Sequence, residues 1–150
     1  MRLLLDTMCG GLRASLRMCG HDTAYSLDRD CEAGGEVLEL VESEDRTLVT
    51  RNVQLAERVD ESILLRERDV VDELGELHRA GVDLTLDESP AFCGACNGSL
   101  ERVGPAEPTA EDAPDPRTEA VWRCADCGQL FWKGSHWERV AETLEAVRDG

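Results

Sequence analysis

The sequence predicts an α/β protein in which a parallel sheet is covered by helices on both faces, followed by a small metal-binding module. Two observations predict the first part: short apolar runs alternate with segments of helical periodicity, and turn residues separate them. Successive parallel strands need long crossover connections, which place helices over the faces of the sheet. A third observation predicts the second part, because two Cys-x-x-Cys pairs occur beyond residue 90.

The expected strands are short apolar runs bounded by polar residues or glycine. We expect them at residues 3–5, 23–25, 47–50, 63–65 and 82–86, the last at the edge of the sheet. Apolar residues at helical spacing predict helices at residues 11–19, 36–43, 53–58 and 69–80. Asp69 is expected to cap the last helix and Gly81 to end it. Residues 1–89 therefore form the predicted first domain.

Pro90 marks the expected start of a second unit over residues 90–134. Short strands at residues 121–123 and 129–132 flank its second cysteine pair, which is typical of a zinc ribbon. Residues 104–116 contain four of the five prolines and almost no large apolar side chain. That composition predicts an excursion from the ribbon.

Residues 135–150 are expected to form a terminal helix. Ser135 and Glu138 have the spacing of a capping box at its start. The apolar residues of this segment fall on one stripe, which predicts that the helix packs against the rest of the protein: Trp137, Val140, Leu144 and Val147.

The two cysteine pairs have the spacing of a structural zinc site. Each Cys-x-x-Cys turn directs two thiolates toward one point, and two such turns supply four soft ligands for tetrahedral zinc. Two disulfides or a redox pair are the alternatives, but a redox motif does not come in matched pairs. We therefore expect zinc at Cys93, Cys96, Cys124 and Cys127. The remaining cysteines lack partners at ligand spacing: Cys9, Cys19 and Cys31.

The charge balance is strongly acidic, with a net charge of −16 over 150 residues. Lys133 is the only lysine, and the acids are spread along the chain instead of forming a tail. This composition suits a halophilic, archaeal protein, because in concentrated salt the Debye length falls to about 3 Å and self-repulsion is screened. No apolar run is long enough to cross a bilayer and nothing directs export, so we expect a soluble, cytoplasmic protein with no membrane partner.

Polar side chains follow three of the expected strands. Because ligands gather beyond the carboxyl ends of parallel strands, these groups are expected to share one edge of the sheet. They are Asp6, Asp28, Asp30, Glu36 and Asn52. Oxygen ligands of this kind select Mg²⁺ or Mn²⁺, which can activate water for attack on a phosphodiester. In so acidic a chain, carboxylates at strand ends also arise by coincidence, and that alternative stays open.

Cations near the same edge are candidates for binding RNA. Arg13, Arg17 and Arg51 can hold phosphates in a bidentate manner, although solvated surface arginines need no function. His136 is a further candidate, with a structural role at the start of its helix as the alternative. The acidic total does not exclude RNA, because counterion release contributes little at high salt.

Six short segments, in chain order, carry a family resemblance. They are Leu3-Leu4-Leu5-Asp6-Thr7-Met8, Gly11-Leu12 followed by Leu16-Arg17 and Gly20-His21-Asp22-Thr23, Leu48-Val49-Thr50-Arg51, Cys93-x-x-Cys96-Asn97-Gly98, Trp122-Arg123-Cys124-x-x-Cys127-Gly128, and Phe131-Trp132-x-Gly134-Ser135-His136-Trp137. Together they resemble the Mut7-C ribonuclease domain family over essentially the whole chain. The resemblance implies a PIN-like three-layer α/β/α sandwich with a C-terminal zinc ribbon, metal-dependent cleavage of RNA and a bound zinc.

The resemblance also implies that Asp6 is the first acid of a PIN-like active site. The family usually has an acid at the start of the second helix, where this chain has Gly34 and Gly35, and an aspartate where it has Asn52. The nearest substitutes are the loop acids, including Glu32, and Glu36. We therefore expect an Mg²⁺- or Mn²⁺-dependent endoribonuclease. The alternative is a catalytically weakened module that binds RNA or a protein partner, and the oligomeric state stays open.

Overall fold

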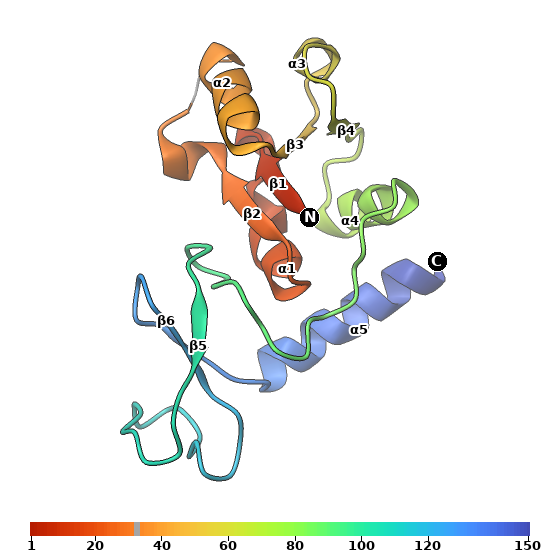
Figure 1. The fold of residues 1–150 in the computed structure, drawn as a ribbon. Coiled ribbons are helices and arrows are strands. Elements are labelled where there is room, and N and C mark those ends of the chain that lie inside the picture. The colour runs from red at the N-terminus through yellow and green to blue at the C-terminus, as the bar shows by residue number, and fades with distance from the viewer. Residues whose placement is uncertain (32–33) are drawn as a thin grey trace.

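The computed structural model describes residues 1–31 and 34–150, and its first unit is built on a four-stranded parallel sheet (Figure 1). The strand order is β2-β1-β3-β4, so β1 and β3 are central. All three pairings are parallel. The strands are β1 (Arg2–Leu5), β2 (Asp22–Tyr25), β3 (Thr47–Thr50) and β4 (Ser62–Leu64).

Helices cover both faces of this sheet, as the alternation of strands and helices predicts. One face carries α1 (Arg13–Met18), α4 (Val70–Arg79) and α5 (Ser135–Asp149). The other carries α2 (Gly34–Glu44) and α3 (Val53–Glu57). Successive side chains of a strand point to opposite faces, so Leu3 and Leu5 join the first core while Leu4 joins the second. The three-layer α/β/α fold class is confirmed.

Short 3₁₀ helices follow two of the strands. They are η1 (Thr7–Leu12), directly after β1, and η2 (Ser26–Arg29), directly after β2. Both lie at the carboxyl end of the sheet, where they carry the chain toward α1 and α2. Asp69 caps α4 as expected, because its carboxylate accepts a hydrogen bond from the Val71 amide at 3.2 Å.

The expected edge strand at residues 82–86 is wrong. The segment buries Val82 and Leu84, but it forms no ladder with the sheet. Side chains satisfy its carbonyls instead: His21 Nε2 donates to Asp83 O at 2.6 Å, and Arg148 Nη1 donates to Leu84 O at 2.6 Å. Val82 and Leu84 are apolar because they pack into the core with residues of α4 and α5. A buried β-strand has the same apolar pattern, so the sequence alone does not distinguish the two.

The second unit is a three-stranded antiparallel sheet of order β5-β6-β7. Its strands are β5 (Leu100–Arg102), β6 (Trp122–Cys124) and β7 (Leu130–Phe131). The sequence predicted β6 and β7 but not β5. The Val103 amide donates to Val121 O at 2.8 Å. The excursion over residues 104–116 therefore lies between β5 and β6, next to the end of the ladder that these two strands form.

The terminal helix α5 returns to the first unit and packs against α4 (Figure 1). Leu144 is fully buried, and Val140 and Val147 pack around it against the core. The expected capping box is wrong, because Gly134 is the N-cap and no side chain caps the helix. Glycine is needed there, since a Cβ at residue 134 would lie 2.9 Å from Trp132 Nε1.

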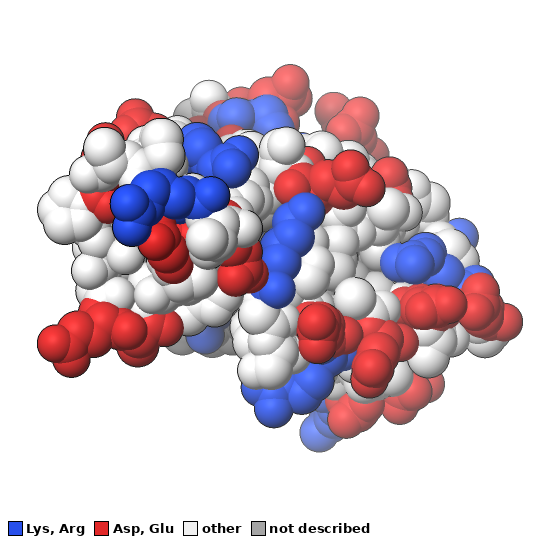
Figure 2. All heavy atoms as spheres, turned by 90° about the horizontal axis from the view of Figure 1, so that it is seen from below, with Lys and Arg blue, Asp and Glu red and all other residues white. Residues whose placement is uncertain are grey.

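Acidic side chains outnumber basic ones by 32 to 16. Figure 2 shows Asp and Glu side chains scattered over one face and interspersed with basic ones. None of the helices formed by the described residues is long and apolar enough to cross a membrane.

Candidate functional site

The four cysteines of the two Cys-x-x-Cys pairs form one cluster. Their Sγ atoms all lie within 4.8 Å of one another. The Cys93–Cys127 and Cys96–Cys124 Sγ distances are 3.7 and 3.5 Å. A zinc tetrahedron with bonds of about 2.3 Å separates its sulfurs by roughly 3.8 Å. The donor set and its spacing therefore fit a zinc ion, which would tie the two turns together.

The backbone around the cluster is shaped for sulfur ligation. The residue after each Cys-x-x-Cys turn has a left-handed conformation, with φ of 67° at Asn97 and 78° at Gly128. A Cβ at Gly98 would lie only 2.8 Å from Cys124 Sγ. Burial alone would raise the pKa of Cys124, but amide hydrogen bonds from Cys127 and Asp126 outweigh it and lower the pKa to about 7. A low pKa favours the thiolate that binds metal.

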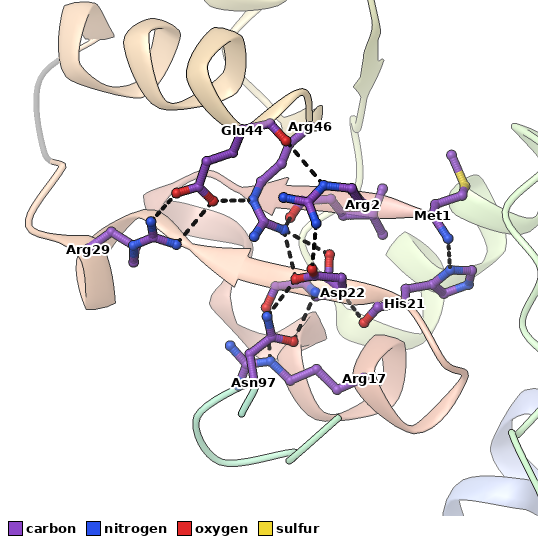
Figure 3. A network of polar contacts seen from close by, with 11 residues as sticks. Met1, Arg2, Arg17, His21, Asp22, Arg29, Glu44, Arg46 and Asn97 are labelled. Carbon is purple, nitrogen blue, oxygen red and sulfur yellow. Dashed lines mark hydrogen bonds and ion pairs between the residues drawn. The ribbon is translucent and has the colours of Figure 1, made fainter. Parts of the chain in front are cut away.

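Asn97 connects the cysteine cluster to the parallel sheet (Figure 3). Its Oδ1 accepts a hydrogen bond from the Thr23 amide at 3.0 Å, and its Nδ2 donates to Asp22 Oδ1 at 2.7 Å. Thr23 and Asp22 belong to β2, an edge strand. The first cysteine turn therefore covers the open edge of the sheet.

Arg17 is buried, which corrects the expectation that it binds RNA. Its side chain is only 1% exposed. Nε donates to Thr23 O at 2.9 Å and Nη1 donates to Gly94 O at 2.9 Å. The guanidinium joins β2 to the first cysteine turn and cannot reach a phosphate from there.

A polar network occupies the amino end of the sheet (Figure 3). The Asp22 carboxylate accepts hydrogen bonds from Arg2, Arg46 and Asn97. Burial alone would raise the pKa of Asp22, but these partners hold it below its ordinary value. Arg46 also contacts Glu44 at 2.8 Å. The network lies at the opposite end of the strands from Asp6, and it serves the fold.

Asp6 lies at the carboxyl end of β1, where the sequence places it. The residue is 8% exposed. Its Oδ1 accepts from the Thr7 amide at 2.8 Å, and its Oδ2 accepts from Thr50 Oγ1 at 2.7 Å. Thr50 ends the neighbouring strand β3, so two adjacent strand ends fix the orientation of this carboxylate.

Asn52 contacts the same threonine but uses its own side chain elsewhere. Its backbone amide donates to Thr50 Oγ1 at 3.0 Å. Its Oδ1 accepts from the Leu55 amide at 3.1 Å and caps α3. The carbonyl oxygen expected to ligate a metal is therefore engaged as a helix cap.

Among the described residues, the acids predicted to join Asp6 form no group of three potential metal ligands with it. Asp28, Asp30 and Glu36 are exposed, and Asp28 lies 3.8 Å from Arg13. Glu32 lies outside the described residues. Within the described part of the chain, the cysteine cluster is the only group of three or more potential metal ligands. These residues thus do not fit a preassembled Mg²⁺ or Mn²⁺ site.

The remaining predicted cations occupy different places. Arg13 lies at the carboxyl end, with its guanidinium 4.6 Å from the centre of the Tyr25 ring. Arg51 follows β3 directly, and its Nη2 donates to Met8 O at 3.2 Å. His136 is exposed and lines a pocket between α1, the ribbon and α5, away from Asp6.

The sequence analysis did not identify Glu73, a buried acid that contacts Arg51 at the carboxyl end of the sheet. The residue is 2% exposed, and its carboxylate lies 3.4 Å from Arg51 Nη1. Burial raises the pKa of Glu73, although Arg51 opposes the shift. The burial of Glu73 could have been predicted from the sequence, because Glu73 shares a helical face with the apolar residues Val70 and Leu77.

One of three comparisons with known proteins found a match for this chain. No curated protein and no solved structure was found to match the chain. The family model described as Mut7-C RNAse domain matches residues 1–144. That match spans the parallel sheet, both cysteine turns and most of α5. The chain therefore belongs to the Mut7-C RNAse domain family.

Proposed function

We propose that this protein is a ribonuclease that cleaves RNA phosphodiesters at the carboxyl edge of its parallel sheet, with Asp6 as the central acid. The observation that carries the proposal is the Thr50–Asp6 hydrogen bond of 2.7 Å at two adjacent strand ends. It holds a carboxylate at the edge where open α/β sheets bind ligands. Membership of an RNAse domain family supports the choice of reaction.

Asp6 has the acceptor capacity that such a reaction needs. A carboxylate offers about four lone-pair sites, and two of those on Asp6 accept hydrogen bonds from Thr7 and Thr50. A further site can orient a water molecule and accept its proton as the water attacks phosphorus. Arg51 lies at the same edge, where its positive charge can stabilise the transferring phosphoryl group.

Dependence on Mg²⁺ or Mn²⁺ is the finer part of the proposal. A divalent ion bound at Asp6 would supply an activated water and neutralise charge on the phosphate. The proposed additional ligands are the exposed acids Asp28 and Asp30 after β2 and Glu36 in the first turn of α2. Because these acids and Asp6 form no group of three potential ligands in the described part of the chain, we propose that they approach Asp6 when RNA and the ion are both bound.

The test is cleavage of a labelled single-stranded RNA at high KCl, with added Mn²⁺, with added Mg²⁺ and with neither. Leaving out the ion is preferable to a chelator, which would also remove zinc. We expect Mn²⁺-stimulated cleavage that falls at least about 100-fold in Asp6→Asn. The matched control is Asp112→Asn, the same change at an exposed residue of the 104–116 excursion. Equal cleavage by Asp6→Asn and the wild type would overturn the proposal.

A second candidate function is binding of RNA without efficient cleavage. The observation that favours it is the engagement of Asn52 Oδ1 as the cap of α3. Asn52→Asp separates the two candidates, because aspartate caps helices as well as asparagine does and leaves the fold intact. A large gain from no activity indicates a weakened nuclease that acts as a binding module. Little change from an active wild type indicates an enzyme that does not need an acid there.

A further inference from the structure

Three arginines converge on one groove at the carboxyl end of the sheet, in a chain whose net charge is −16. The groove has a volume of about 380 Å³. No acidic residue lines it, and its lining residues are Met8, Arg51, Val53, Leu64, Leu65, Arg66 and Arg68. Since acids outnumber basic residues 32 to 16, a lining with three cations and no anion is a local reversal of charge.

One of the three cations, Arg51, is held in place by the fold. Arg51 Nη1 donates to Glu67 O at 3.3 Å and contacts the buried Glu73 carboxylate at 3.4 Å. Its Nη2 donates to Met8 O at 3.2 Å. These contacts fix the guanidinium between η1, the loop after β4 and α4.

The other two arginines lie on the loop after β4, which a single carboxylate anchors. Glu76 accepts hydrogen bonds from the Arg66 amide at 3.0 and 3.1 Å and from the Glu67 amide at 2.8 Å. Arg66 and Arg68 line the groove, whereas Glu67 between them does not. Within residues 1–31 and 34–150, neither arginine forms an ion pair, so both guanidinium groups are available to an anion.

Exposed apolar side chains flank the cations. Met8 is 56% exposed and Val53 is 53% exposed, and both line the groove. They are among the few large apolar residues that this protein leaves in water. A surface that combines cations with exposed apolar groups suits a ligand that has phosphates and flat bases.

We propose that this groove binds the ribose-phosphate backbone of an RNA strand and leads it to Asp6, with Arg51, Arg66 and Arg68 as the phosphate ligands. The groove adjoins the candidate site, because Arg51 directly follows Thr50, the residue bonded to Asp6, and Met8 is two residues beyond Asp6. The inference rests on the proposed function, and it adds the path of the substrate. RNA is favoured over an acidic protein because the groove lies at the same end of the sheet as Asp6, a carboxylate suited to phosphodiester chemistry.

The test measures affinity for a fluorescent oligouridine by anisotropy at several KCl concentrations. All chains carry Asp6→Asn so that the RNA stays intact. Each phosphate contact contributes about 0.7 to the slope of log affinity against log salt concentration for single strands. We expect Arg66→Gln and Arg68→Gln each to lower the slope by about 0.7, and the double variant by about 1.4. Arg117→Gln is the matched control, since it removes one positive charge at the residue that follows the 104–116 excursion, outside the groove, and should leave the slope unchanged.

The outcomes separate this inference from the proposed function. If the double variant binds RNA with an unchanged slope, the groove does not bind the RNA backbone and this inference is overturned. The proposed ribonuclease function still stands in that case if the chain without the arginine substitutions cleaves RNA in an Asp6-dependent manner. Absence of RNA binding in the Asp6→Asn chain, together with absence of cleavage, overturns both. Light scattering on the same samples tests a protein occupant. A change of oligomeric state in the double variant, with RNA affinity unaltered, assigns the groove to a protein interface and overturns the inference.

Discussion

The Asn97 side chain takes the place of a neighbouring strand beside Thr23. Its Oδ1 accepts from the Thr23 amide at 3.0 Å, while Arg17 Nε donates to the Thr23 carbonyl at 2.9 Å. Both backbone groups of an edge-strand residue are thus satisfied by side chains. Open strand edges invite pairing with other chains, and this arrangement closes one. The cysteine cluster therefore does more than hold the ribbon together, because it positions Asn97 against the sheet.

Replacing Asn97 should weaken the whole fold. Asn97→Gly keeps the left-handed backbone, with φ of 67°, but removes two hydrogen bonds. We expect the free energy of unfolding to fall by about 1–3 kcal/mol. Asn97→Ala should cost about 1 kcal/mol more, because alanine adds strain at positive φ. Urea unfolding of the zinc-loaded protein, followed by tryptophan fluorescence, measures both values. Wild-type stability in Asn97→Gly would show that the amide contacts contribute nothing.

Zinc should be lost with any one of the four cysteines. Cys96→Ser removes a thiolate from a cluster whose sulfurs lie within 4.8 Å of one another. We expect elemental analysis to give about one zinc per wild-type chain and almost none in the variant. Cys31→Ser is the control, since Cys31 is not part of the cluster and should leave the zinc content unchanged. A full zinc complement in Cys96→Ser would remove Cys96 from the ligand set.

Features set by neighbours in the sequence could be predicted. The strand expected at residues 47–50 is β3, and Asp69 caps α4, because alternation and capping are local properties. Features that depend on distant contacts could not. The segment at residues 82–86 does not pair with the sheet, and His21 and Arg148 reach two of its carbonyls from elsewhere in the chain.

The candidate site divides in the same way. The position of Asp6 follows from the end of an apolar strand, and the cysteine cluster follows from its spacing. Arg17 looks like a surface arginine in the sequence, but it is buried and donates to Gly94 O, which lies far along the chain in the ribbon. Asn52 could be expected to face the metal edge, but capping α3 competes for the same oxygen.

Stability should depend on pH through His21. Its Nε2 donates to Asp83 O at 2.6 Å, while Nδ1 lies 3.0 Å from the Met1 amino group and accepts from it, so the ring is neutral in the fold. Burial lowers the pKa of His21 below its ordinary value of 6.5. The unfolded chain then binds more protons between the two pKa values, and the free energy of unfolding rises with pH in that range. This stability is fully present above pH 6.5 and is lost as the pH falls through the lower, folded-state pKa.

The measurement is the free energy of unfolding as a function of pH. His21→Asn should be less stable than the wild type and should lose less stability as the pH falls below 6.5. His136→Asn changes an exposed histidine and should keep the wild-type dependence. An unchanged pH dependence in His21→Asn would assign the effect to other groups.

Thr50 should control catalysis through its hydroxyl. Oγ1 donates to Asp6 Oδ2 at 2.7 Å and accepts from the Asn52 amide at 3.0 Å, so one atom orients the carboxylate and ties it to the start of α3. Thr50→Val keeps the volume and removes the hydroxyl, and loss of such an orienting bond typically costs 10- to 100-fold in activity. Thr50→Ser retains the hydroxyl and should restore most of the RNA cleavage rate. Because the residue is fully buried, unfolding curves of both variants should accompany the kinetics. If Thr50→Ser is folded but cleaves RNA as slowly as Thr50→Val, then packing at this position, and not the hydroxyl, matters for the reaction.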